Sequence, residues 1–171
     1  MFKLILISLS LMIVTGCSTS TKSEAPVISQ KVKHKMFQTV SKKEAILVQK
    51  GKDKEYCCMC GMNLVKFYKT SHAAKEGKIE HQYCSLHCLA KDIRNGAKVK
   101  NLQVVDVTSL KFIPVREAHY VVGSRKRGTM SRVSKYAFKS LKDAKKFQSK
   151  YGGKIVDFHS AWQIAKKDFK K

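Results

Sequence analysis

Sulfur-bearing residues are concentrated in two short stretches of the sequence. Five of the six cysteines lie in CCMCGM (residues 57–62) and CSLHC (residues 84–88). Thiolate and thioether sulfurs are soft donors that select Cu(I), and thiolates alone also suit zinc. These residue types therefore predict a site for a soft metal ion.

The spacing of the cysteines leaves four interpretations open. Cys57-x-x-Cys60 and Cys84-x-x-x-Cys88 are separated by 23 residues, a pattern compatible with a four-thiolate zinc site. Disulfides are a second interpretation, although five thiols would leave one unpaired. Thiol–disulfide exchange is a third, but redox motifs place Cys-x-x-Cys at the start of a helix, whereas residues 61–63 lead into a β-type run.

The fourth interpretation is a Cu(I) site in which Met62 and Met130 supply thioethers beside the thiolates. A protein that hands copper on needs an accessible site, because the ion leaves by ligand exchange with the recipient. Cys58 and His87 are less favoured ligands. The other histidines have no partner that spacing identifies, so we expect core or surface roles for His34, His72, His81, His119 and His159.

The N-terminus predicts export. Residues 1–16 have the pattern of a signal segment, with Lys3 before an apolar stretch (residues 4–14) that is too short to span a bilayer. The segment ends in Val-Thr-Gly-Cys17, which resembles the lipobox of bacterial lipoproteins and implies cleavage before Cys17 and acylation, such as palmitoylation, of that residue. Residues 17–35 would then form a lipidated tether at the cell envelope, facing the periplasm or the cell exterior.

The chain is strongly basic, with 35 Lys and Arg against 12 Asp and Glu. Such a balance would suit nucleic acid, but an exported protein meets little of it, and the excess charge is spread along the chain. We therefore expect a solvated basic surface and no nucleic-acid partner. Attraction to anionic headgroups or to an acidic partner, weakened by salt, is the alternative.

Hydrophobic patterns predict a mixed α+β fold. In the first half, a helix is expected over residues 84–94, with Cys84 and Cys88 on the side opposite the apolar stripe and therefore directed away from the core. Strands or β-type runs are expected at residues 45–49, 65–68, 78–83 and 102–107, with 65–68 and 78–83 forming a hairpin.

The second half repeats this plan more faintly. Strands are expected at residues 112–115, 118–122 and 154–158, and helices at 141–151, entered through 136–138, and at 160–167. Setting the halves side by side places residues 60–62 opposite 128–130. The pattern predicts two small β-β-α-β units from an internal duplication, one over residues 36–108 with the Cys/Met cluster and one over 109–171 with a C-terminal helix.

Several short motifs together resemble the NosL family. They are Cys57-x-x-Cys60-Gly61-Met62, Tyr120-Val121-Val122-Gly123-Ser124, Gly128-Thr129-Met130-Ser131 and Gly152-Gly153, within residues 56–168. The family consists of lipid-anchored accessory proteins of nitrous oxide reductase, the copper enzyme of denitrification. The resemblance implies a pair of β-β-α-β units and a Cu(I)-binding metallochaperone that works with that reductase and a membrane transporter.

The resemblance also implies site residues. Cys60, Met62 and Met130 match the family's sulfur positions, and Cys57 matches its first cysteine. The chain departs from the family in having Cys58 and Met59 where a proline and an aliphatic residue are common. We therefore expect a lipid-anchored Cu(I) protein that is not an enzyme. A structural four-cysteine zinc module is the first alternative, and a thiol–disulfide exchange protein is the second.

Overall fold

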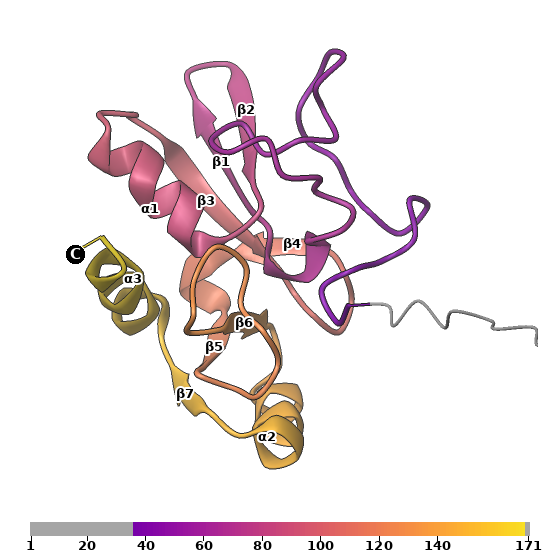
Figure 1. Ribbon diagram of the computed structural model, residues 1–171, viewed down its shortest axis with the longest axis vertical. Coiled ribbons are helices and arrows are strands. Elements are labelled where there is room, and N and C mark those ends of the chain that lie inside the picture. The colour runs from indigo at the N-terminus through magenta and orange to yellow at the C-terminus, as the bar shows by residue number, and fades with distance from the viewer. Residues whose placement is uncertain (1–35, 170–171) are drawn as a thin grey trace, which may run out of the picture. The chain divides into compact units, whose positions relative to one another are not determined.

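The computed structural model describes residues 36–169, so the predicted signal segment and the whole predicted tether, including Cys17, lie outside the described residues. Within this range the chain forms two antiparallel sheets and three α-helices (Figure 1). The predicted α+β class is confirmed. In the described part of the chain, no helix has the length and apolar character needed to cross a membrane.

The first sheet has four strands in the order β2-β1-β3-β4. The connection from β2 to β3 contains helix α1. The elements are β1 (His72–Glu76), β2 (Ile79–Tyr83), α1 (Leu86–Arg94), β3 (Lys100–Val105) and β4 (Phe112–Pro114).

The second sheet has three strands in the order β6-β5-β7. Helix α2 lies between β6 and β7 in the sequence and packs on this sheet, and helix α3 follows β7. The elements are β5 (His119–Val122), β6 (Lys135–Phe138), α2 (Leu141–Tyr151), β7 (Lys154–Val156) and α3 (Phe158–Lys167).

Both sheets contain a β-β-α-β unit in which the first strand is central and the other two flank it. This shared order agrees with the predicted duplication, which stays a prediction. The predicted strand pair of the second unit is wrong, because β4 joins the first sheet and residues 135–138 form a strand instead of leading into the helix. The matching of residues 60–62 with 128–130 is also wrong, since the first segment precedes β1 and the second connects β5 to β6.

Two segments expected to be β-type do not form strands. Residues 45–49 have no regular secondary structure and bond to side chains: the Val48 N–H donates to Gln82 Oε1 (3.0 Å) and the Ile46 N–H donates to the Tyr68 hydroxyl (3.0 Å). Residues 65–68 lie in turns and at the start of the short 3-10 helix η1 (Tyr68–Thr70). The true partner of β2 is β1, whose small residues gave little β signal.

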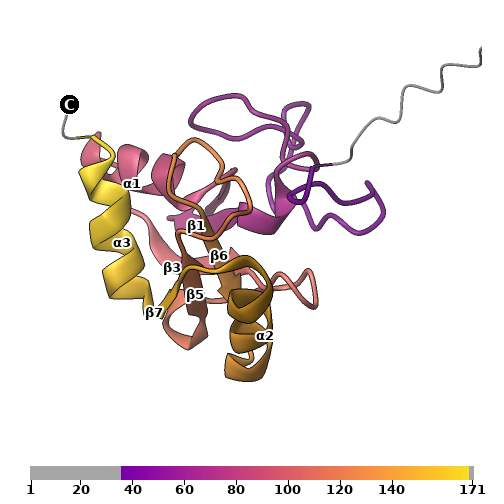
Figure 2. The same cartoon turned by 60° about the horizontal axis from the view of Figure 1, so that its bottom comes forward.

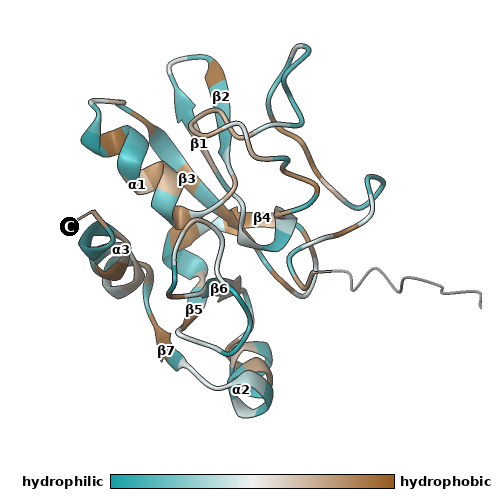
Figure 3. Cartoon of the chain, viewed as in Figure 1, coloured by the Kyte–Doolittle hydropathy of each residue, from teal (hydrophilic) through white to brown (hydrophobic). Residues whose placement is uncertain are grey.

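The core beside the cysteines is built by α1. Leu86, Leu89 and Ala90 are buried, as the predicted apolar stripe required, while Lys91 and Arg94 are exposed. Figure 3 shows hydrophobic and hydrophilic residues alternating along this helix accordingly. Figures 1 and 2 both show α3 beside α1, and the two helices pack together.

Candidate metal centre

Cys57 and Cys60 lie on a tight hairpin that precedes β1. An antiparallel bridge closes the hairpin at Tyr56 and Asn63. The N–H of Gly61 donates to the Cys57 carbonyl (2.9 Å), and Gly61 has a φ of 71°, a backbone conformation that favours glycine. The Cys-x-x-Cys-Gly spacing therefore supplies the turn that brings both thiols to one cluster.

Cys84 and Cys88 lie at the N-terminal end of α1. Ser85 caps the helix, its side chain accepting a hydrogen bond from the Cys88 N–H (3.4 Å). Cys84 therefore precedes the cap, and Cys88 lies in the first turn. The free N–H groups and positive dipole end of a helix stabilise nearby thiolates.

The predicted position of Cys84 on the helix is wrong, and both thiols are buried. Cys84 is 0% exposed and Cys88 is 1% exposed. The helix begins two residues later than expected, at Leu86, so Cys84 is not on the helical face that the wheel assigned to it. Cys88 does face away from the apolar stripe, but the Cys57–Cys60 hairpin covers it.

The four thiols form one compact cluster. The sulfur atoms of Cys57, Cys60, Cys84 and Cys88 all lie within 4.8 Å of one another. Cys60 Sγ is 3.6 Å from Cys84 Sγ and 3.5 Å from Cys88 Sγ, and Cys84 Sγ is 3.6 Å from Cys88 Sγ. All five described cysteines are free thiols, and of these four only Cys60 is exposed. An ion held here would therefore be reached from solvent on the Cys60 side.

The pKa values of the clustered thiols are shifted in opposite directions. Hydrogen bonds from the thiols of Cys84 and Cys88 lower the pKa of Cys57. The same bonds raise the pKa of Cys84 and of Cys88, and burial adds to the increase. The cluster therefore favours one thiolate that accepts S–H bonds from its neighbours, and a metal ion would displace the remaining protons.

Cys58 is held apart from the cluster. Its backbone N–H donates to the Gln82 carbonyl (3.2 Å), and its thiol contacts the Tyr83 hydroxyl, which donates to Asp92 Oδ2 (2.8 Å). Desolvation of the thiol, with the nearby Cys57 and Asp92, raises the pKa of Cys58 to about 12. The extra thiol is therefore not part of the four-thiol cluster.

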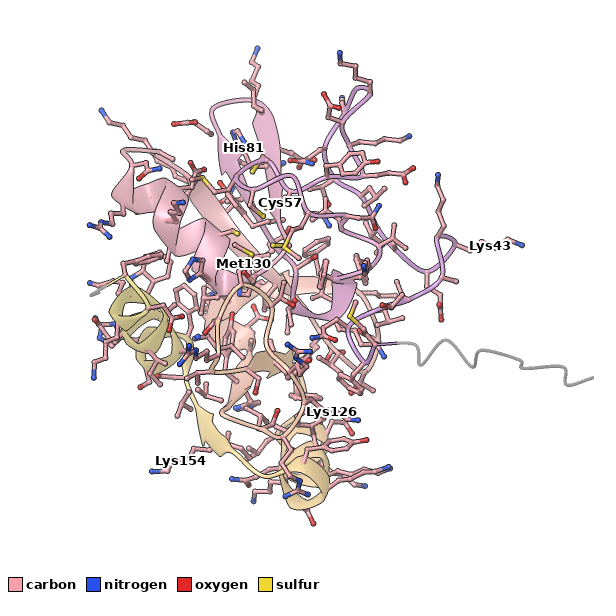
Figure 4. The ribbon with its side chains drawn as sticks, in the orientation of Figure 1. Lys43, Cys57, His81, Lys126, Met130 and Lys154 are labelled. Atoms are coloured by element: carbon pink, nitrogen blue, oxygen red, sulfur yellow. The ribbon has the colours of Figure 1, made fainter. Side chains whose placement is uncertain are left out.

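The two methionines flank the cluster, whereas His87 does not join it. Met62 is half-buried against the core that contains the buried cysteines. Met130 is 44% exposed and lies on the β5–β6 loop, at the end that faces the labelled Cys57 in Figure 4. His87 is directed instead to the end of α3, where its Nδ1 is 3.6 Å from Asp168 Oδ2.

A buried hydroxyl joins the β5–β6 loop to the cluster. Thr70 Oγ1 is 2.8 Å from the Cys84 carbonyl oxygen and 2.8 Å from Thr129 Oγ1, the residue before Met130. Thr129 belongs to the Gly128-Thr129-Met130-Ser131 motif, whereas no pattern in the sequence identified Thr70.

Comparison with known proteins agrees with this arrangement. The family model for NosL matches residues 48–163. The chain belongs to the NosL family. The crystal structure of the copper chaperone NosL from Shewanella denitrificans is similar to it, with a TM-score of 0.52 and 26% sequence identity over 65% of this chain and 92% of that chain. No protein with a curated description matches the chain.

The predicted resemblance to NosL is therefore confirmed, and with it the α+β architecture. The match spans the hairpin, α1 and the β5–β6 loop, so every sulfur discussed above except that of Cys17 lies within the NosL region. In this NosL chain, Cys58 and Met59 occupy the turn between the two hairpin ligand candidates, and Cys58 is kept out of the cluster by its contact with Tyr83.

Proposed function

We propose that this NosL chain is a Cu(I) metallochaperone that carries copper as cargo to an exported copper enzyme. The observation that carries the proposal is the four-thiol cluster with one exposed member. Met62 packs against the core that contains the buried cysteines, and Met130 follows Thr129, which Thr70 joins to the Cys84 carbonyl. Soft sulfur donors select Cu(I). The copper chaperone among its structural relatives supports the same cargo, and it supports the prediction that the chain is not an enzyme.

The exposure pattern suits an ion that must leave. Three thiols are buried, and Cys60 opens to solvent at the edge of the cluster. A sulfur ligand from a recipient could approach the ion there and replace Cys60 first. Met62 and Met130 would stabilise the ion as thiolates are exchanged, because a thioether is a soft but neutral donor that is readily displaced.

A structural zinc site is the second candidate, and the sulfur separations favour it. A tetrahedral ion with bonds of about 2.3 Å to sulfur places the four sulfurs about 3.8 Å apart. The three separations among Cys60, Cys84 and Cys88, 3.5 to 3.6 Å, are close to that edge length, and the Cys57 sulfur lies within 4.8 Å of the other three. This geometry accounts for the four thiols but assigns no role to Met62 or Met130.

The recipient and the membrane attachment follow from family membership and from the N-terminal pattern. Nitrous oxide reductase is the recipient that the NosL family suggests, with a membrane transporter as a further partner. The lipobox that ends at Cys17 supports a lipid anchor, which would hold the domain at the cell envelope through residues 17–35. Nucleic acid has no place in this function.

Anaerobic metal competition on the reduced full chain in detergent tests the proposal. We expect one Cu(I) per chain, held far more tightly than zinc, and a loss of at least about tenfold in Cu(I) affinity for Met62→Leu, equivalent to about 1.4 kcal/mol. Met36→Leu is the control, because Met36 is a methionine that precedes the site in the chain and is 37% exposed, whereas Met62 is half-buried. Tight zinc binding that is needed for folding and indifferent to Met62 and Met130 would support the structural zinc module instead.

A further inference from the structure

The β5–β6 loop, residues 123–134, is fastened at its base. The Gly123 N–H donates to the Ser134 carbonyl (2.9 Å), and the hydroxyls of Ser124 and Ser134 lie 2.8 Å apart. Inside the loop, a Cβ on Gly128 would lie 2.6 Å from the Ser131 carbonyl oxygen, so the backbone leaves no room for a side chain there. The β5–β6 loop is therefore tightly folded, with a conformation that its own hydrogen bonds and backbone packing determine.

Two polar contacts hold the loop on either side of Met130. Before it, Thr129 is joined through Thr70 to the carbonyl of Cys84. After it, the ammonium group of Lys135 donates to Ser131 Oγ (3.0 Å) and to the Val133 carbonyl (3.1 Å). Met130 thus lies between a contact to the thiol cluster and a contact to a lysine.

Lys135 is placed in an unusual environment for a lysine. Its side chain is 5% exposed, and its ammonium group lies 3.3 Å from Asp168 Oδ2 at the end of α3. Burial of a charged group is unfavourable unless hydrogen bonds and a counter-charge satisfy it, as the two loop oxygens and Asp168 do here. The charge therefore fixes the geometry of the loop relative to α3, which an apolar residue of similar size would not do.

Met130 itself has a backbone that needs such support. Its φ is 56°, in the left-handed region that non-glycine residues seldom adopt, and its side chain is 44% exposed. Neither intrinsic backbone preference nor burial of the side chain keeps it there. Strained conformations persist where surrounding contacts determine them, and they are concentrated at functional sites.

We propose that Lys135 is a positioning residue for Met130: it holds the β5–β6 loop so that the thioether meets a copper ion bound by the thiols. This inference rests on the proposed function, in which Met130 is a copper ligand. Residues that orient metal ligands typically change metal affinity by 10- to 100-fold when they are replaced. Lys135 has no direct contact with a cysteine of the cluster. An effect passed through the Thr129–Thr70 bridge to Cys84, or through Asp168 to His87, would persist without Met130, whereas a positioning effect on Met130 would not.

A double-mutant cycle on the reduced full chain in detergent tests the coupling. Cu(I) affinity is measured by competition with a chromophoric Cu(I) chelator for the unaltered chain, Lys135→Met, Met130→Leu and the double variant. We expect Lys135→Met to weaken Cu(I) binding about tenfold when Met130 is present. In the Met130→Leu background the same change should have less than a twofold effect. Lys139→Met, a matched change of an exposed lysine just after β6, should have no effect in either background.

The outcomes separate the two proposals. If Met130→Leu leaves Cu(I) affinity unchanged, Met130 is not a ligand and the proposed function loses that residue. If Met130→Leu weakens binding but Lys135→Met has no effect, or an effect that persists without Met130, the positioning role is refuted. Co(II) bound to the four thiols gives thiolate charge-transfer absorption, which should be the same in all variants. If the Lys135→Met variant loses this absorption, Asp168→Asn takes the place of Lys135→Met in the cycle. The same result is then expected: weaker Cu(I) binding when Met130 is present and less than a twofold effect in the Met130→Leu background.

Discussion

The buried Thr70 hydroxyl offers the sharpest test of how the metal centre is assembled. Thr70 is 3% exposed, and its Oγ1 is 2.8 Å from the Cys84 carbonyl oxygen, 2.8 Å from Thr129 Oγ1 and 3.0 Å from the Phe67 carbonyl oxygen. Thr70→Val keeps the shape of the side chain and removes only the hydroxyl. The substitution therefore isolates the polar bridge between η1, the cysteine cluster and the β5–β6 loop.

The magnitude follows from the groups left without partners. The Thr70 hydroxyl is the donor toward two carbonyl oxygens and the Thr129 hydroxyl, and its removal leaves a buried carbonyl without a donor and breaks the contact to Thr129. Leaving a buried carbonyl unsatisfied costs about 1–3 kcal/mol, and loss of the second hydrogen bond adds about 0.5–1.5 kcal/mol. We therefore expect Thr70→Val to lower the free energy of unfolding by about 2–4 kcal/mol.

Urea unfolding of the reduced, metal-free chain measures this loss, because bound metal would stabilise the folded state and mask it. Thr39→Val is the matched control: Thr39 Oγ1 donates to the Lys66 carbonyl (2.9 Å) in an exposed setting, where water can replace the bond. The control should cost less than about 1 kcal/mol. Equal losses for the two variants would refute the argument that burial of the Thr70 bridge makes it important.

Two further predictions concern the second sheet and a buried histidine. Gly153→Ala should destabilise the fold by about 2–3 kcal/mol in the same urea assay, because the φ of Gly153 is 98° and an added Cβ would lie 2.7 Å from the Val122 carbonyl; Gly77→Ala, with open space around it, should cost about 1 kcal/mol. Burial lowers the pKa of His72 from 6.5 to about 3. Below pH 6.5 the His72 imidazole therefore binds a proton in the unfolded chain, but in the folded chain it binds one only near pH 3. As the pH falls from 6.5 to 3, His72 should therefore reduce the free energy of unfolding by about 1.4 kcal/mol for each pH unit. His72→Gln should flatten that part of the stability profile, and an unchanged slope would contradict the assignment.

The parts of this molecule that depend on local sequence were predictable. The Ser140 cap, the α2 helix and its end at Gly152 are as predicted, because capping and helix-stop signals act within a few residues. The pairing of the two cysteine motifs into one cluster was also expected from their spacing. The start of α1 was placed two residues early, so Cys84 was assigned to a helical face that it does not occupy, and the burial of both thiols was not predicted.

Features that depend on distant segments were not predictable. The strand β1 contains Ala73 and Ala74, which have little intrinsic β preference, and its pairing with β2 and β3 determines it. Residues 65–68 alternate like a strand, yet they form turns because the Tyr68 hydroxyl bonds to the Ile46 N–H and the Leu110 carbonyl. Tertiary hydrogen bonds overrode the local pattern in both places.

The two sheets contribute unequally to the metal centre, and this asymmetry explains why the matching of residues 60–62 with 128–130 failed although both segments concern the site. All four clustered thiols come from the first unit, on its hairpin and at the start of α1. The second unit supplies no thiol, but the loop between its first two strands lies against Cys84 through Thr129 and Thr70. The same strand pair of the first unit is joined by a turn at Gly77 and carries no ligand candidate. In the proposed function, the second sheet would serve the site by holding one exposed thioether, that of Met130, at its edge.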